Sequence, residues 1–199
     1  MKIKIQNSIT KILILFLLYC SISFCDQKNE KKIDSNQNIK LKIFSSLTCP
    51  HCANFHKNVV IKLKGDNELN SIVQFEHIGF PLDLAALNAE KVLYCIENQE
   101  KRFKLLTHLY DEQDNWASGS DINVINESLK KIGNKYVKNK SDITKCLKDE
   151  EMEEKILQKF LDAQKDFKIT STPTIFINQK KYEGKHNYKD FKKEIKKLF

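Results

Sequence analysis

Apolar and polar residues alternate at two places in the first half of the chain. Residues 39–44 read Ile-Lys-Leu-Lys-Ile-Phe, and this period of two is typical of a half-buried β-strand. Residues 72–80 are rich in β-branched and aromatic side chains and predict a second strand. Between them, a three-to-four-residue spacing predicts a helix that buries Phe55, Val59 and Leu63. A strand, helix and strand in this order favour a parallel pair joined by a crossover helix.

The middle of the chain shows the periodicity of helices. Apolar stripes predict helices from Asp83 to about Asn98, over 102–110, from Asp121 onward, over a short segment after Ser141, and from about Glu150 to Phe167. Asp83 and Asp121 precede their stripes and are suited to cap helix N-termini. The pattern therefore predicts a helical segment over about 83–166.

Strand-forming residues return near the C-terminus. Residues 174–178 predict a strand, residues 179–180 a turn, and residues 181–184 an edge strand. A final amphipathic helix with Tyr188, Phe191, Ile195 and Leu198 on one face would cover the sheet. The order of elements places the chain in the α/β class, and its 199 residues with 41% apolar content suit one domain with a sizeable core.

The N-terminal 25 residues have the pattern of a secretory signal. Lysines precede a short apolar run at 12–19, which is shorter than the roughly 20 residues that span a bilayer. A cleaved signal peptide over 1–25 is predicted. A short membrane anchor and a lipid on Cys20 or Cys25 are the alternatives. Residues 26–38 are polar and predict a flexible linker.

The formal net charge of +8 comes largely from lysines on predicted helix faces. No arginine-rich patch interleaves with aromatic residues, which argues against nucleic acid as a partner. A basic surface favours acidic proteins or anionic membranes only weakly. Six cysteines together with a signal peptide indicate an oxidising compartment outside the cytoplasm.

The segment Cys49-Pro50-His51-Cys52 lies where the first strand meets the first helix. Free backbone N–H groups and the helix dipole at that point favour a thiolate at Cys49, so its pKa should fall. Pro50 suits a first helical turn, and a protonated His51 would stabilise the thiolate further. The spacing lets Cys52 close a disulfide with Cys49. The predicted chemistry is thiol–disulfide exchange.

Two other interpretations of this motif remain open at this stage. The pair could be a structural disulfide. Alternatively, Cys49, Cys52 and His56 could bind zinc, with His77 as a fourth ligand, because residues three and four apart share a helix face.

Three stretches resemble the DsbA-like thiol:disulfide oxidoreductases of the thioredoxin superfamily: Phe-Ser-Ser-Leu-Thr-Cys-Pro-His-Cys-Ala at 44–53, Phe-Pro-Leu-Asp at 80–83 and Thr-Pro-Thr-Ile-Phe-Ile at 172–177. The resemblance covers nearly everything after residue 38. It implies a thioredoxin-like fold over 39–199 with an inserted helical subdomain. It also implies that a cis Pro173 faces the cysteine pair and that Thr172 and Pro173 bind the extended chain of a substrate.

The resemblance further implies an exported enzyme that introduces disulfides into reduced secreted proteins. Cys49 and Cys52 would be its redox pair with His51 beside them, without a metal or organic cofactor. A membrane reoxidase of the quinone-linked type would be its partner, and the periplasm or another extracytoplasmic space its location, with a monomer favoured. The alternatives are a disulfide isomerase or reductase of the same fold and a non-catalytic exported module that binds metal through the cysteine pair.

Two positions depart from the family pattern. Many relatives carry a buried acid six residues before the first cysteine, whereas this chain has Ile43. Removal of the proton from Cys52 then needs another base or a water. Thr172 stands where the best-known branch has Val, and Thr there is common among isomerase-type relatives.

Cys95 and Cys146 are the remaining cysteines after residue 25. Four cysteines allow three pairings, and some DsbA-like relatives carry a second disulfide in the insertion. The resemblance therefore implies a structural Cys95–Cys146 bond. The alternative is two buried free thiols.

Overall fold

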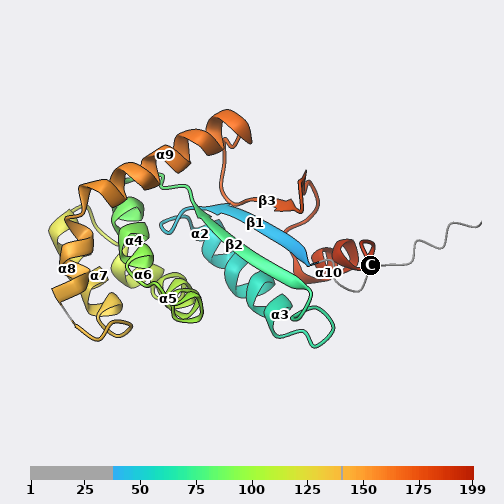
Figure 1. Ribbon diagram of the computed structural model, residues 1–199, viewed down its shortest axis with the longest axis horizontal. Coiled ribbons are helices and arrows are strands. Elements are labelled where there is room, and N and C mark those ends of the chain that lie inside the picture. The colour runs from blue at the N-terminus through green and yellow to red at the C-terminus, as the bar shows by residue number, and fades with distance from the viewer. Residues whose placement is uncertain (1–37, 140) are drawn as a thin grey trace, which may run out of the picture. The chain divides into compact units, whose positions relative to one another are not determined.

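A four-stranded sheet forms the centre of the protein, in the order β2-β1-β3-β4 (Figure 1). The computed structural model describes residues 38–139 and 141–199. The strands are β1 (Ile39–Ser45), β2 (Val73–Gly79), β3 (Thr174–Ile177) and β4 (Lys180–Lys181). β1 pairs in parallel with β2 and antiparallel with β3, and β3 pairs antiparallel with β4. The parallel pair confirms the predicted crossover. The signal peptide and most of the linker lie outside the described residues and stay predictions.

One face of the sheet is covered by the crossover helix and the C-terminal helix. The crossover helix consists of α2 (Pro50–Phe55), a π-helical turn (His56–Val60) and α3 (Ile61–Lys64), and the C-terminal helix is α10 (Tyr188–Lys196). The predicted inward residues of the crossover are buried, with Leu63 fully enclosed. They pack with Phe191 and Ile195 on the apolar residues of this face, which are Ile39, Leu41, Ile43, Ile175 and Ile177.

Six helices separate β2 from β3 in the sequence. They are α4 (Leu84–Tyr94), α5 (Gln99–Asp111), α6 (Gln113–Trp116), α7 (Ile122–Gly133), α8 (Ser141–Leu147) and α9 (Glu150–Asp166). α4 to α8 group at one side of the sheet, and α9 leads back over it (Figure 1). The insertion has its own apolar core, and this core continues onto Leu47, Cys49 and Cys52. The helical subdomain is therefore packed directly against the cysteine motif.

Polar caps set several helix boundaries. Asp83 accepts a hydrogen bond from the Ala86 N–H at 2.7 Å and begins α4, as expected. The next boundary differs from the prediction, because Asn98 accepts from the Lys101 N–H at 3.0 Å and starts α5 at Gln99. A single predicted helix to residue 98 is therefore wrong at its end. α4 ends at Tyr94 with Cys95 as its C-cap, and the side chain of Asn98 caps a new helix instead of lying within the first one.

The C-terminal hairpin is also shorter than expected. Asn178 has φ 57°, in the left-handed region that asparagine tolerates. The chain therefore turns at residues 178–179, and β4 spans only two residues instead of 181–184. Leu198 lies beyond α10 and is exposed rather than packed on the sheet. In the part of the chain described, no helix is long and apolar enough to cross a bilayer.

Candidate active site

Cys49 and Cys52 lie at the start of the crossover helix. Cys49 is the N-cap of α2, and its carbonyl accepts from the N–H groups of Cys52 and Ala53 at 3.0 and 3.1 Å. Pro50 occupies the first helical turn, as predicted, where a backbone N–H would have no partner within the helix. Both cysteines are free thiols in this structure. Cys49 is 8% exposed, whereas Cys52 is 1% exposed, so Cys49 is the more accessible sulfur.

The two thiols differ strongly in acidity. The hydrogen bond from the Cys52 side chain is the main cause that lowers the pKa of Cys49 from 9.0 to about 5, against the opposing effect of burial. The Thr172 side chain and the backbone N–H groups of Cys52 and His51 lower this pKa further. The same bond with Cys49, followed by burial, raises the pKa of Cys52. At neutral pH the negative charge therefore belongs to Cys49.

His51 is exposed at the helix N-terminus. Its contribution to the lowered pKa of Cys49 is made by its backbone N–H. The role predicted for its imidazole as a stabiliser of the thiolate therefore stays a prediction.

The Thr172–Pro173 peptide bond is cis and lies against the cysteine pair. In its protonated form, the Cys49 thiol donates to the Thr172 carbonyl at 3.6 Å. Thr172 Oγ1 is buried and has no hydrogen-bond partner among the residues described. A hydroxyl there can donate to a thiolate. An open groove of about 350 Å³ runs beside this pair, lined by His51, Asn54, Phe55, Ser171, Thr172, Pro173 and His186.

The loop that carries Cys49 is held by side chains from the helical insertion. Gln113 is 5% exposed and donates through Nε2 to the carbonyls of Leu47 and Cys49 at 2.7 and 3.2 Å. Thr48 donates to Asp83 at 2.7 Å. Sequence reasoning missed Gln113, because no motif marks it. It assigned Asp83 only to the cap of α4.

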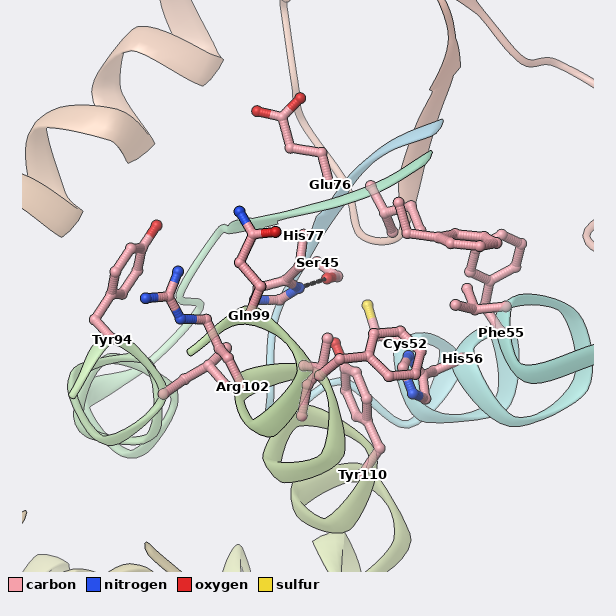
Figure 2. A pocket seen from close by; sticks show the side chains of 16 residues that line it. Ser45, Cys52, Phe55, His56, Glu76, His77, Tyr94, Gln99, Arg102 and Tyr110 are labelled. Atoms are coloured by element: carbon pink, nitrogen blue, oxygen red, sulfur yellow. Dashed lines mark hydrogen bonds between the residues drawn. The ribbon is translucent and has the colours of Figure 1, made fainter. Parts of the chain in front are cut away.

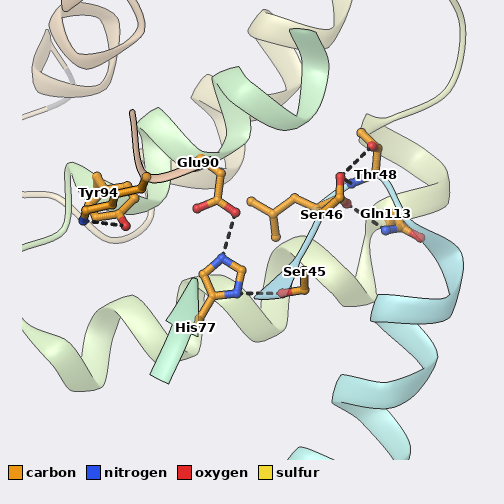
Figure 3. Close-up of polar contacts among 9 residues, drawn as sticks. Ser45, Ser46, Thr48, His77, Glu90, Tyr94 and Gln113 are labelled. Atoms are coloured by element: carbon orange, nitrogen blue, oxygen red, sulfur yellow. Dashed lines mark hydrogen bonds and ion pairs between the residues drawn. The ribbon is translucent and has the colours of Figure 1, made fainter. Parts of the chain in front are cut away.

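Behind Cys52 lies a cavity of about 250 Å³ between the crossover helix, β1, β2 and α5. The Cys52 sulfur points into it, and Ser45 and His77 lie on the facing wall (Figure 2). Ser45 Oγ is 3.0 Å from His77 Nδ1, and His77 Nε2 is 2.7 Å from Glu90 Oε1 (Figure 3). Sequence reasoning gave His77 a functional role only as a zinc ligand and missed this network.

The proposed zinc ligands do not come together. His56 Nε2 is 2.9 Å from Thr107 Oγ1, and its ring packs between Phe103 and Tyr110. Burial lowers the pKa of His56 to about 3, so it is neutral. Within residues 38–139 and 141–199, no group of three or more His, Cys, Asp or Glu side chains is arranged to hold a metal ion.

Cys95 and Cys146 lie apart from the redox pair, in the insertion. They are bonded as a disulfide, with their Cα atoms 6.0 Å apart. Cys95 follows α4 and Cys146 lies in α8, so the bond ties the two helices together. Its structural role stays a prediction.

Comparison with known proteins places this geometry in a family. The profile of the thioredoxin family matches residues 34–197. A Rickettsia bellii protein named as a protein-disulfide oxidoreductase is 28% identical over 139 residues. That match covers 68% of this chain and 51% of the relative, so the chain spans about half the length of the curated relative it matches.

Solved structures share the fold over most of the chain. The crystal structure of Wolbachia pipientis alpha-DsbA1 has a TM-score of 0.72 and 28% identity, with coverage of 83% of this chain and 87% of that one. BdbD from Bacillus subtilis has a TM-score of 0.70 at 18% identity, with coverage of 82% and 89%. The fold is thus the thioredoxin fold with an inserted helical domain, as expected. The chain belongs to the DsbA-like group of the thioredoxin superfamily.

Proposed function

We propose that this protein is an exported thiol:disulfide oxidoreductase that introduces disulfides into reduced secreted proteins. The observation that carries the proposal is the contrast between Cys49, which is the less buried thiol, has a low pKa and lies beside the Thr172 carbonyl, and the fully buried Cys52 of raised pKa. A nucleophile or leaving group at Cys49 and a protected partner at Cys52 suit dithiol–disulfide exchange. The names of the Rickettsia and Wolbachia relatives agree with this class of chemistry.

The exchange would begin at the oxidised Cys49–Cys52 pair. A client thiolate attacks the Cys49 sulfur, the Cys49–Cys52 bond breaks, and Cys52 leaves as a thiolate that takes up a proton. A second client thiolate then attacks the client sulfur of the mixed disulfide and releases Cys49 as a thiolate. The client is oxidised and the protein is reduced. Thr172 and Pro173 would hold the extended client through its backbone, as in strand addition. The redox-active disulfide itself is the only cofactor required.

Two further parts of the proposal concern partners and place. A quinone-linked membrane reoxidase would restore the Cys49–Cys52 disulfide. The signal-like N-terminus would direct the chain to the periplasm or another extracytoplasmic space. The signal would then be cleaved or would tether the protein to the membrane. A disulfide isomerase or reductase is the second candidate, because Thr172 rather than Val precedes Pro173. In an isomerase or reductase, the Cys49–Cys52 pair would be kept in its reduced form.

Equilibration with a series of glutathione redox ratios tests the direction of exchange. A lowered Cys49 pKa stabilises the reduced form, so we expect a potential above the about −270 mV of thioredoxin, toward the about −120 mV of DsbA. The oxidised protein should also oxidise a reduced dithiol peptide, and Cys49→Ser should abolish this. A potential near that of thioredoxin, with reshuffling of scrambled disulfides by the reduced protein, would favour the isomerase or reductase. Iodoacetamide should alkylate Cys49 before Cys52, and the reverse order would contradict the assigned roles.

A further inference from the structure

Each exchange at this site moves a proton at Cys52. Cys52 must accept one when it leaves the disulfide and lose one when it attacks Cys49. Its sulfur is buried and its pKa is raised, so exchange with bulk water is hindered. The acid that many relatives place on β1 is replaced by the buried Ile43. The need for a proton carrier rests on the proposed function.

The register of the sheet puts a titratable group beside the replaced position. His77 on β2 is the direct partner of Ile43 on β1. Its ring contacts Ser45 at Nδ1 and Glu90 at Nε2. One tautomer satisfies both contacts with Glu90 as an acceptor, since Nε2–H then donates to Oε1 and Nδ1 accepts the Ser45 hydroxyl. A base oriented by a carboxylate on its far side is an arrangement suited to proton transfer.

Glu90 is positioned for this contact. Its side chain is fully buried, and Oε2 has no hydrogen-bond partner among the described residues. Gly79 makes room for it, because a Cβ at that position would lie 2.6 Å from the Glu90 side chain. A carboxylate enclosed in this way, with one free oxygen, can compensate a positive charge on His77.

The cavity connects the network to the sulfur. Cys52, Ser45 and His77 all line it, and Figure 2 shows the sulfur directed toward the Ser45–His77 wall. Most of its lining is apolar, but Ser45 and His77 offer polar atoms to water, and its volume of about 250 Å³ leaves room for bridging water molecules. A continuous path can therefore run from Cys52 through water and the Ser45 hydroxyl to His77.

We propose that His77, held by Glu90, carries the proton of Cys52 through Ser45 and the cavity, in place of the acid that Ile43 replaces. When a client thiolate breaks the Cys49–Cys52 bond, the protonated His77 supplies the proton that converts the leaving Cys52 thiolate to a thiol. When Cys52 attacks Cys49 in a mixed disulfide, neutral His77 takes its proton. The new Cys49–Cys52 bond then forms, and the partner sulfur leaves as a thiolate with the electron pair.

The pH dependence of this step depends on every titratable group around the cavity. Those facing His77 are Glu90 from α4, His56 from the crossover helix, Arg102 and Tyr110 from α5, and Tyr94 at the end of α4. Glu76, next to His77 on β2, directs its exposed carboxylate away from it (Figure 2). Burial keeps His56 neutral and raises the pKa of Tyr110, so neither group changes its charge near neutral pH.

A pH-jump measurement isolates the Cys52 step. The reduced protein is treated with Ellman's reagent at acid pH, so that Cys49 carries one thionitrobenzoate. A jump to higher pH then lets Cys52 attack, and the released thionitrobenzoate absorbs. We expect His77→Gln to slow this release by roughly 10²–10⁴-fold at neutral pH, the usual contribution of a positioned base. The difference should vanish at strongly alkaline pH, where hydroxide removes the proton.

Matched variants separate a proton relay from a structural effect. Glu76→Gln changes an exposed residue of the same cavity and should leave the release unchanged. Ser45→Ala should slow it like His77→Gln, and it serves as the main test if His77→Gln unfolds. Equal rates in wild type and relay variants at neutral pH would overturn the relay and leave the proposed function intact, as would an equal slowing at every pH. Failure of wild-type Cys49 to form the mixed disulfide would instead count against the proposed function.

Discussion

Gln113 Nε2 donates a hydrogen bond to the backbone carbonyl of Leu47 at 2.7 Å and a second one to that of Cys49 at 3.2 Å. The helical insertion thus holds the loop in front of the redox pair with a neutral amide. An amide satisfies these carbonyls without placing a charge beside the Cys49 thiolate.

We expect Gln113→Leu to destabilise the protein by about 1–3 kcal/mol, because two carbonyls of the loop lose their donor. The rate of Cys49 alkylation should also change, since the loop carries the N-cap of α2. Urea unfolding and timed alkylation measure the two effects. Gln158→Leu on the exposed face of α9 is the control and should alter neither. A stability equal to that of the wild type would show that Gln113 does not hold the loop.

The stability of the reduced protein should depend on pH more steeply than that of the oxidised protein. The pKa of Cys49 is about 5 in the folded state, against an ordinary 9.0 for the unfolded thiol. The stabilisation by this lowered pKa is fully present above pH 9 and is lost as the pH falls toward 5. Urea unfolding of both redox forms across this range measures the difference. Cys49→Ser should remove it, and a difference that stays constant with pH would contradict the assigned pKa.

His51→Ser should raise the pKa of Cys49 and make the disulfide less oxidising by tens of millivolts, where about 30 mV corresponds to about 1.4 kcal/mol. The imidazole is exposed, so added salt should reduce the shift. Thiolate absorbance against pH and the glutathione equilibrium measure it. Asn54→Ser, which changes another exposed residue beside the groove, is the matched control. An unchanged pKa of Cys49 in this titration would show that the His51 side chain does not tune the thiolate.

Replacing both Cys95 and Cys146 by alanine should destabilise the protein by about 2–4 kcal/mol, because the bond closes a loop of 51 residues. The redox chemistry of Cys49 and Cys52 should persist. Thermal unfolding of the double variant and thiol counting in the oxidised, denatured wild type test this. Two reactive thiols at these positions in the wild type would exclude the structural disulfide.

The fold and the cysteine pair could be predicted because local patterns determine them. Alternation marked β1, and the helix-terminal motif marked Cys49. Contacts across the sheet could not be predicted in the same way. His77 has no signal within its own strand, and its importance follows only from a register that sets it against Ile43. Gln113 has none, because it acts on carbonyls more than sixty residues away.

The hydrogen bond between Cys49 and Thr172 joins residues 123 positions apart. At a synthesis rate of roughly 5–20 residues per second, the cysteines leave the ribosome about 6–25 s before the residues that face them. During this interval the edge of β1 that later pairs with β3 is also unpaired. In a nascent chain, Cys49 and Cys52 are therefore synthesised before Ser171, Thr172 and Pro173, which line the groove beside them. The capacity to bind an extended chain is acquired last, when the C-terminal quarter folds against β1.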